Sequence, residues 1–228
     1  MLEGAELQAL LTSLAVAGRA ILFALPLAVL VAWLLARRHT PARFVLNAVA
    51  HAPLVLPPVV VGYGLLLLFG VKGPVGSVLL HVFHVRLAFT TWGAALAAGV
   101  MAFPLMVRAL RLSFEAIDPG LEVAARSLGA RPLDRFFSIA LPLAAPGVAA
   151  AAIIGFAACL GEFGAVITFA ANIPGETQTL PLAIYAALQS PDGDALALRL
   201  SLISFAIAIL ALAASEVLAR RAQRLAGR

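Results

Sequence analysis

The feature that most constrains this chain is a series of five long apolar stretches that carry almost no charge. A helix needs about 20 mostly apolar residues to cross the roughly 30 Å hydrocarbon core of a bilayer. The stretches are continuously apolar and do not alternate residue by residue, so they predict spanning helices and not barrel strands. We therefore expect an all-α, polytopic transmembrane helical bundle forming a single domain over residues 1–228. The five expected spans are Ser13–Ala36, Leu54–Phe69 (with a lead-in from Val45), Ala88–Val107, Leu143–Phe169 and Leu198–Leu218.

The overall composition excludes an ordinary soluble domain. Hydrophobic residues make up 63% of the chain and charged residues 12%, against about 25% charged residues in typical soluble domains. One soluble core of this size cannot bury so much apolar surface, so membrane lipid is the expected surrounding. The net charge of +5 does not indicate a nucleic-acid partner, because the arginines lie between the apolar stretches and form no basic face. The first residues lack a secretory-signal pattern, so we expect the first stretch to remain as a helix.

The basic residues predict how the chain crosses the membrane. With the N-terminus outside, the inner segments carry twelve arginines and the outer segments only Lys72, Arg86 and Arg199. Positive charge is concentrated in the cytoplasmic loops of membrane proteins. We therefore expect the N-terminus outside and the C-terminus in the cytoplasm. The inner arginines are Arg37, Arg38, Arg43, Arg108, Arg111, Arg126, Arg131, Arg135, Arg220, Arg221, Arg224 and Arg228.

Two apolar segments are not expected to form regular spans. Pro53, Pro57 and Pro58 remove backbone donors from the second stretch and interrupt its helix. The segment Leu180–Gln189 is apolar but too short to cross a bilayer. We expect it to form a short outer or re-entrant helix that starts after Thr179.

No set of side chains in the sequence predicts catalysis. The glycine cluster over residues 70–77 lacks the spacing of a nucleotide-binding GxxxxGK[ST] loop. His81 and His84 stand three residues apart but have no acidic or cysteine ligand nearby, so interfacial histidines are favoured over a metal site. We expect no catalytic residue, no metal and no cofactor.

The inner loop over residues 108–142 carries the clearest local signal. Asp118 is a candidate N-cap and Pro119 suits the first helical position. Gly129 is placed to end the helix in the left-handed conformation. The sequence therefore predicts a short capped helix at the cytoplasmic surface, where it could meet a docking partner or lipid headgroups. Its small apolar face consists of Leu121, Ala124, Ala125 and Leu128.

The segment Glu122–Gly129, followed by Ile139, Leu141 and Pro142, resembles the EAA loop of binding-protein-dependent ABC importer permeases. Val123 stands where that loop usually has its acidic residue, and Glu122 lies one place earlier. The resemblance implies a coupling helix that a groove on a separate ABC ATPase subunit receives. The residues that it assigns to this coupling are Glu122, Ala124, Ala125, Leu128 and Gly129.

Two further segments, His51–Tyr63 and Leu160–Thr177, resemble the molybdate permease subunit. Sulfate permeases share its Gly-Glu-aromatic-Gly element, so sulfate, thiosulfate and tungstate remain alternative substrates. The resemblance implies a type I ABC importer permease that takes up an oxyanion by alternating access and hydrolyses no ATP itself. It also implies a homodimer in a bacterial or archaeal plasma (inner) membrane, with two ATPase subunits and a periplasmic or other extracytoplasmic oxyanion-binding protein.

The interrupted segments Pro53–Gly62 and Gly161–Gly164 are the candidates for the translocation path. Irregular backbone at membrane depth is tolerated only where protein buries it or where it lines a water-filled cavity. Along one continuous helix from Leu143, Glu162 would lie about 28 Å up the axis, near the outer interface. Its carboxylate would repel a dianion, so hydrogen bonding to freed backbone is favoured over gating. The path or gate candidates are Pro57, Pro58, Gly161, Glu162, Gly164 and Thr168.

Two other classes of function remain as rivals. An ion-coupled secondary transporter would be expected to show ion ligands at the midplane and an internal repeat, and neither is evident in the sequence. A membrane-embedded enzyme would need a nucleophile with a base or a metal, and Ser201 and Ser204 have neither beside them in the sequence.

The arginine distribution generates a topology prediction. A reporter fused after Arg228 should be active in the cytoplasm, and one inserted in the Pro191–Asp194 loop should be active outside. The measurement is paired alkaline phosphatase and fluorescent-protein fusions in whole cells. Cytoplasmic activity in the Pro191–Asp194 loop would reverse the predicted direction of the last span.

Overall fold

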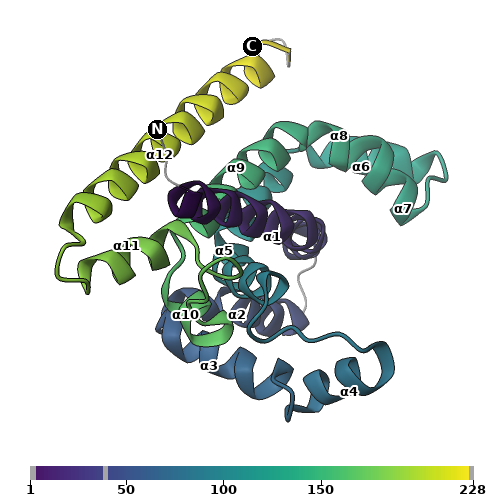
Figure 1. The fold of residues 1–228 in the computed structure, drawn as a ribbon. Coiled ribbons are helices and arrows are strands. Elements are labelled where there is room, and N and C mark those ends of the chain that lie inside the picture. The colour runs from purple at the N-terminus through teal and green to yellow at the C-terminus, as the bar shows by residue number, and fades with distance from the viewer. Residues whose placement is uncertain (1–3, 38–40, 226–228) are drawn as a thin grey trace.

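The computed structural model describes residues 4–37 and 41–225, and all regular structure in these ranges is helical (Figure 1). The helices are α1 (Gly4–Arg37), α2 (Pro41–Val55), α3 (Pro58–Phe69), α4 (Pro74–Phe83), α5 (Thr91–Glu115), α6 (Pro119–Ser127), α7 (Pro132–Arg135), a π-helical turn (Phe136–Ala140), α8 (Leu141–Leu143), α9 (Ala145–Gly161), α10 (Gly164–Ala170), α11 (Leu180–Leu188) and α12 (Asp194–Leu225). The predicted all-α bundle is confirmed.

Helices α1, α5 and α9 pack together as the centre of the bundle. Small residues line their contacts: Ala17, Ala97, Ala98 and Ala151 are completely buried. A Cβ placed on Gly99 of α5 would lie 3.6 Å from the Cβ atoms of both Ala20 and Ala24 of α1. Association of helices in a bilayer depends on close packing, because lipid is as apolar as the side chains it would replace. The many alanines and glycines therefore allow these three backbones to approach closely.

Three described helices are long and apolar enough to cross a membrane, within Gly4–Arg37, Thr91–Glu115 and Asp194–Ala211. Two further pairs of helices are long and apolar enough to cross only when the two helices of each pair are counted together. The pair Arg43–Val55 and Pro58–Phe69 is bent by 117°, and the pair Pro132–Leu143 and Ala145–Gly161 by 70°. The described residues thus contain three spans made of one helix each, or up to five spans if each bent pair crosses once.

The fourth stretch differs from its prediction as one span over Leu143–Phe169. Helix α9 ends at Gly161, Glu162 is extended with φ −71° and ψ 129°, and α10 begins only at Gly164. The prediction of one continuous span is therefore wrong, and with it the height assigned to Glu162 along a single axis, whereas the interruption proposed at Gly161–Gly164 is present. The reason is that glycine favours breaks in a helix without lowering the apolar character of the stretch.

The second stretch is interrupted where its prolines indicated. Helix α2 ends at Val55 and α3 begins at Pro58, with Pro57 extended between them at φ −55° and ψ 137°. The expected short helix after Thr179 is confirmed as α11, with proline in its first turn. The backbone N–H of Leu180 donates to Ser13 Oγ of α1 at 2.7 Å, which fixes α11 to the first helix.

The tight centre of the bundle generates a stability prediction. A Cβ on Gly155 of α9 would lie 2.5 Å from Met106 Sδ and 2.8 Å from Ile21 Cδ1, whereas one on Gly18 of α1 would meet nothing within 4 Å. Gly155→Val should therefore destabilise the fold by about 1–3 kcal/mol, and Gly18→Val should not. The measurement is the thermal unfolding midpoint in detergent. Equal midpoints for the two variants would contradict the packing described here.

Candidate functional site

The two interrupted stretches meet each other at the start of α3 and the start of α10. A Cβ on Gly164 would lie 2.7 Å from Pro58 Cβ. A Cβ on Gly62 would lie 2.7 Å from the carbonyl oxygen of Ala165 and 2.8 Å from Thr168 Cβ. Only glycine leaves room for such close approach of two helices. The structure thus brings Pro58 together with Gly164 and Thr168, which lie more than a hundred positions later in the chain. The sequence proposed all three as path residues.

Glu162 caps the start of α10. Its Oε1 accepts a hydrogen bond from the backbone N–H of Ala165 at 2.8 Å. Within the same short helix, the side-chain hydroxyl of Thr168 donates to the carbonyl oxygen of Gly164, one turn earlier, at 2.8 Å. A carboxylate is favourable at a helix N-terminus, where backbone N–H groups lack partners inside the helix. The expected hydrogen bond between Glu162 and freed backbone is present, with the carboxylate as acceptor.

Two path candidates lie outside this contact. Gly161 is exposed, and a Cβ placed on it would meet nothing within 4 Å. Pro57 is also exposed and serves as the N-terminal boundary of α3. Both residues therefore shape the chain at the two breaks and do not contribute to the close approach of α3 and α10.

The loop after α10 is held by a polar residue that sequence reasoning did not single out. Thr177 is completely buried. Its Oγ1 accepts from the backbone N–H of Ile173 at 3.0 Å and donates to the carbonyl oxygen of Ala171 at 3.2 Å. A buried threonine hydroxyl that satisfies two backbone groups stabilises a compact loop. The only available signal was its place in the motif that continues from residue 160 to residue 177.

Helix α6 has the caps that the sequence predicts. Asp118 Oδ1 accepts from the backbone N–H of Gly120 at 2.8 Å, and Gly129 adopts φ +84° just beyond the helix. No residue of α6 is buried. The side chain of Leu128 is 88% exposed and that of Leu121 is 45% exposed. An apolar helix face left open in this way is typical of a surface that binds another protein.

One ion pair joins α6 to the long first helix. Glu122 of α6 pairs with Arg37 at the end of α1, and the Arg37 guanidinium lies 5.7 Å from the ring centre of Trp33. Glu122, which the resemblance assigns to coupling, therefore contacts the bundle itself. The apolar residues Leu121 and Ala124 remain exposed on the same short helix, as does Leu128 directly after its end.

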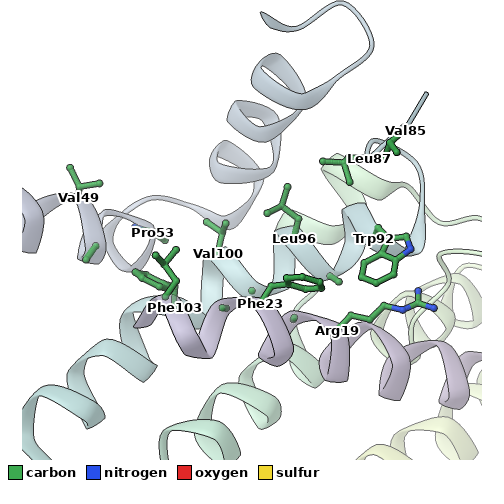
Figure 2. A pocket seen from close by; sticks show the side chains of 16 residues that line it. Arg19, Phe23, Val49, Pro53, Val85, Leu87, Trp92, Leu96, Val100 and Phe103 are labelled. Atoms are coloured by element: carbon green, nitrogen blue, oxygen red, sulfur yellow. The ribbon is translucent and has the colours of Figure 1, made fainter. Parts of the chain in front are cut away.

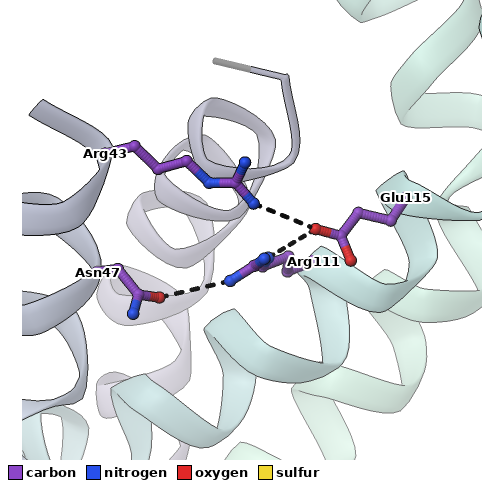
Figure 3. A network of polar contacts seen from close by, with 4 residues as sticks. All are labelled: Arg43, Asn47, Arg111 and Glu115. Atoms are coloured by element: carbon purple, nitrogen blue, oxygen red, sulfur yellow. Dashed lines mark hydrogen bonds and ion pairs between the residues drawn. The ribbon is translucent and has the colours of Figure 1, made fainter. Parts of the chain in front are cut away.

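A second polar network lies at the same end of the bundle, where α5 ends and α2 begins (Figure 3). Arg111 Nε donates to Glu115 Oε1 at 2.7 Å, and Arg43 pairs with the same oxygen at 3.6 Å. Arg111 also donates to Asn47 Oδ1 at 3.5 Å. Sequence reasoning treated these arginines only as a charge bias. In the structure they connect α2 to α5 beside the loop that leads into α6.

With this geometry described, comparisons with known proteins identify the family. Residues 24–224 match the model of the family described as "Binding-protein-dependent transport system inner membrane component". The chain belongs to this family. It is therefore a multi-pass protein of the inner membrane, and every residue predicted for coupling or for the path lies inside the matched region.

Two curated relatives place the chain within this family, and one solved structure has a similar fold. It is 51% identical over 228 residues, all of both chains, to the molybdenum transport system permease protein ModB of Escherichia coli K12. It is 35% identical over 198 residues, 87% of this chain and 71% of the relative, to the sulfate transport system permease protein CysT of Salmonella typhimurium. The fold is similar to a bacterial alginate ABC transporter, crystallised in complex with an alginate pentasaccharide-bound periplasmic protein. That match has a TM-score of 0.72 and 20% identity, and it covers 94% of this chain and 78% of that one.

The contact between α3 and α10 generates a prediction with a control on the same helix. Gly62→Val would force its side chain against Ala165 and Thr168, whereas a Cβ on Gly64 meets nothing within 4 Å. We expect Gly62→Val to separate the two helices at a cost of about 1–3 kcal/mol and to impair transport by the reconstituted transport system. Gly64→Val should transport normally. Normal transport by both variants would show that the close approach is not required.

Proposed function

We propose that this chain is the permease subunit of an ABC importer for an oxyanion, with molybdate as the substrate. The observation that carries the proposal is the 51% identity to the molybdenum permease over the whole of both chains. Similarity to the sulfate permease is lower and covers less of each chain, so sulfate and thiosulfate are weaker alternatives. Tungstate has the same charge and shape as molybdate and remains a second substrate for the same path.

The import of a dianion requires a driven mechanism. Moving two negative charges inward against 100 mV, inside negative, costs about 5 kcal/mol before any concentration gradient. In the proposed complex a separate ATPase subunit supplies this energy, and the permease provides the path. An extracytoplasmic binding protein delivers the anion, as the periplasmic protein bound to the alginate transporter suggests. The proposed permease is a homodimer in which each copy contributes one path-lining half.

The proposed orientation puts the arginine-rich end of the bundle in the cytoplasm. Arg37, Arg43 and Arg111 gather at the end of the bundle that carries α6. At the opposite end of α1, Glu6 pairs with Arg199 near the start of α12 at 3.0 Å. A cytoplasmic α6 is accessible to an ATPase, and the positive-inside tendency supports the same assignment.

The proposed coupling follows the chain from α6 to the path. The exposed face of α6 docks in a groove on the ATPase, while Glu122 holds the helix to α1 through Arg37. From α6 the chain continues through residues 132–143 into α9, across the 70° bend. Helix α9 leads directly to the break at Glu162 and to α10, which packs on α3. A displacement of α6 on ATP binding would thus reach the contact between α3 and α10 through α9.

The proposed substrate is tested with the complete importer in vesicles that contain ATP. Molybdate uptake should require the binding protein and ATP hydrolysis, and excess tungstate should compete with it. Sulfate and thiosulfate should compete only weakly at the same concentrations. Equal competition by sulfate would shift the assignment to a sulfate permease. Uptake driven by an ion gradient without ATP would favour the rival secondary transporter.

The docking face of α6 generates a prediction for coupling. Ala125→Trp would overpack a partner groove by about 1–3 kcal/mol. Gly129→Val would put a branched residue in the left-handed region at a cost of about 1–2 kcal/mol. Both variants should still insert in the membrane but lose ATPase binding about tenfold or hydrolyse ATP without uptake. The measurements are ATPase pull-down and molybdate taken up per ATP hydrolysed.

The matched control for this test is Val123→Trp. Val123 is 55% exposed on α6, and at 100° per residue it lies on the side opposite Leu121, Ala125 and Leu128. A bulky residue there should leave ATPase binding near the wild-type value. If Ala125→Trp and Val123→Trp behave alike, the apolar face of α6 is not the docking surface.

A further inference from the structure

An elongated apolar groove runs along the outside of the bundle between α1, α2 and α5 (Figure 2). Its volume is about 690 Å³. The lining side chains are almost all apolar, with Phe23 and Leu27 from α1, Val49 from α2, and Val100 and Phe103 from α5. No residue of α3 or α10 lines the groove, so it is separate from the contact between those two helices.

One cation, Arg19, lies at an end of this groove. Its guanidinium carbon is 4.6 Å from the ring centre of Trp92 (Figure 2). The Nη1 atom of Arg19 is buried and has no hydrogen-bond partner among the described residues. No acidic residue lines the groove. A guanidinium within a membrane-spanning helix is costly unless it is paired, so this site calls for an anionic group from outside the chain.

The length of the groove corresponds to one leaflet of a bilayer. Its lining extends from Arg19 to Leu27 on α1 and from Trp92 to Phe103 on α5, or about 12 Å and about 16 Å at 1.5 Å per residue. Half of the hydrocarbon core is about 15 Å. Trp92 is the second residue of α5, and tryptophan is enriched where a helix enters the membrane. The end of the groove at Arg19 and Trp92 therefore suits the headgroup region, and its apolar part suits the hydrocarbon.

We propose that this groove binds an anionic glycerophospholipid from the leaflet at the N-terminal end of α5. The phosphate pairs with Arg19 and one acyl chain lies along Phe23, Leu27, Val100 and Phe103. A lipid supplies both parts of the site, an anion at the interface and a chain of one-leaflet length. A small oxyanion would leave the apolar groove empty. A second copy of this chain would have to bring a carboxylate to Arg19 together with an apolar ridge of matching length.

The test uses the complete permease–ATPase complex purified in mixed micelles of phosphatidylglycerol and phosphatidylcholine in equal amounts. The ratio of the two lipids retained by the protein is measured by mass spectrometry after extraction. Arg19→Gln should lower the preference for phosphatidylglycerol about fivefold. The control Lys72→Gln removes an exposed cation elsewhere in the chain and should leave the ratio unchanged.

A second variant tests the acyl chain independently of the charge. Val100→Trp should fill the groove and lower the amount of retained lipid although Arg19 is intact. The control Leu202→Trp, at an exposed apolar position of α12, should not. Thermal unfolding midpoints near the wild-type value establish that the variants are folded.

Three results would overturn the proposal. An unchanged lipid ratio in Arg19→Gln would exclude the headgroup contact, and unchanged retention in Val100→Trp would exclude the chain contact. If either variant loses the dimer without any change in retained lipid, the groove is instead the contact surface for a second copy of the chain.

Discussion

The constraint on which this structure depends is that backbone N–H and C=O groups inside a bilayer need partners within the protein. Continuous helices meet it through their own ladder of hydrogen bonds, and α1 and α5 run for 34 and 25 residues with only one internal proline each. The proposed path requires the helices to be interrupted, so each break must be satisfied locally. Glu162 accepts from the backbone at the start of α10, and Thr177 satisfies two backbone groups in the following loop. These polar residues therefore permit irregular backbone on both sides of α10.

The interrupted region is supported by the packing of its neighbours. Helix α10 contacts α5 as well as α3, and Phe169 of α10 is completely buried. Helix α9 belongs to the same core and also joins the loop that carries α6 to the break at Glu162. Because a closely packed core transmits displacement and does not absorb it, α9 is suited to link the surface helix α6 with the site. The small residues of α1, α5 and α9 keep the three backbones close, so that α9 is tightly packed in the core.

Local features of the site were predictable from the sequence because short-range chemistry decides them. Asp118 caps α6 through a backbone group two residues away, and Gly129 takes the left-handed conformation that glycine best accommodates. The prolines at 57 and 58 marked the first break correctly. The second break falls where the sequence proposed a broken segment, at Gly161–Gly164, but the length of the fourth stretch was still treated as one axis, because hydropathy does not distinguish one helix from two helices at an angle. Thr177 carried no signal at all outside its motif.

The sequence by itself determined that the chain is an all-helical membrane protein with a capped surface helix, because hydropathy and capping act within a few residues. Its motifs also indicated the family. Only the tertiary structure decided which segments meet: α3 with α10, Arg37 with Glu122, and Arg19 with Trp92. Each of these contacts joins residues that are far apart in the chain, and many apolar helix faces are interchangeable by hydropathy alone. The shapes of the helix surfaces decide which faces pack together, because a glycine allows close approach only where the opposing helix has a complementary surface.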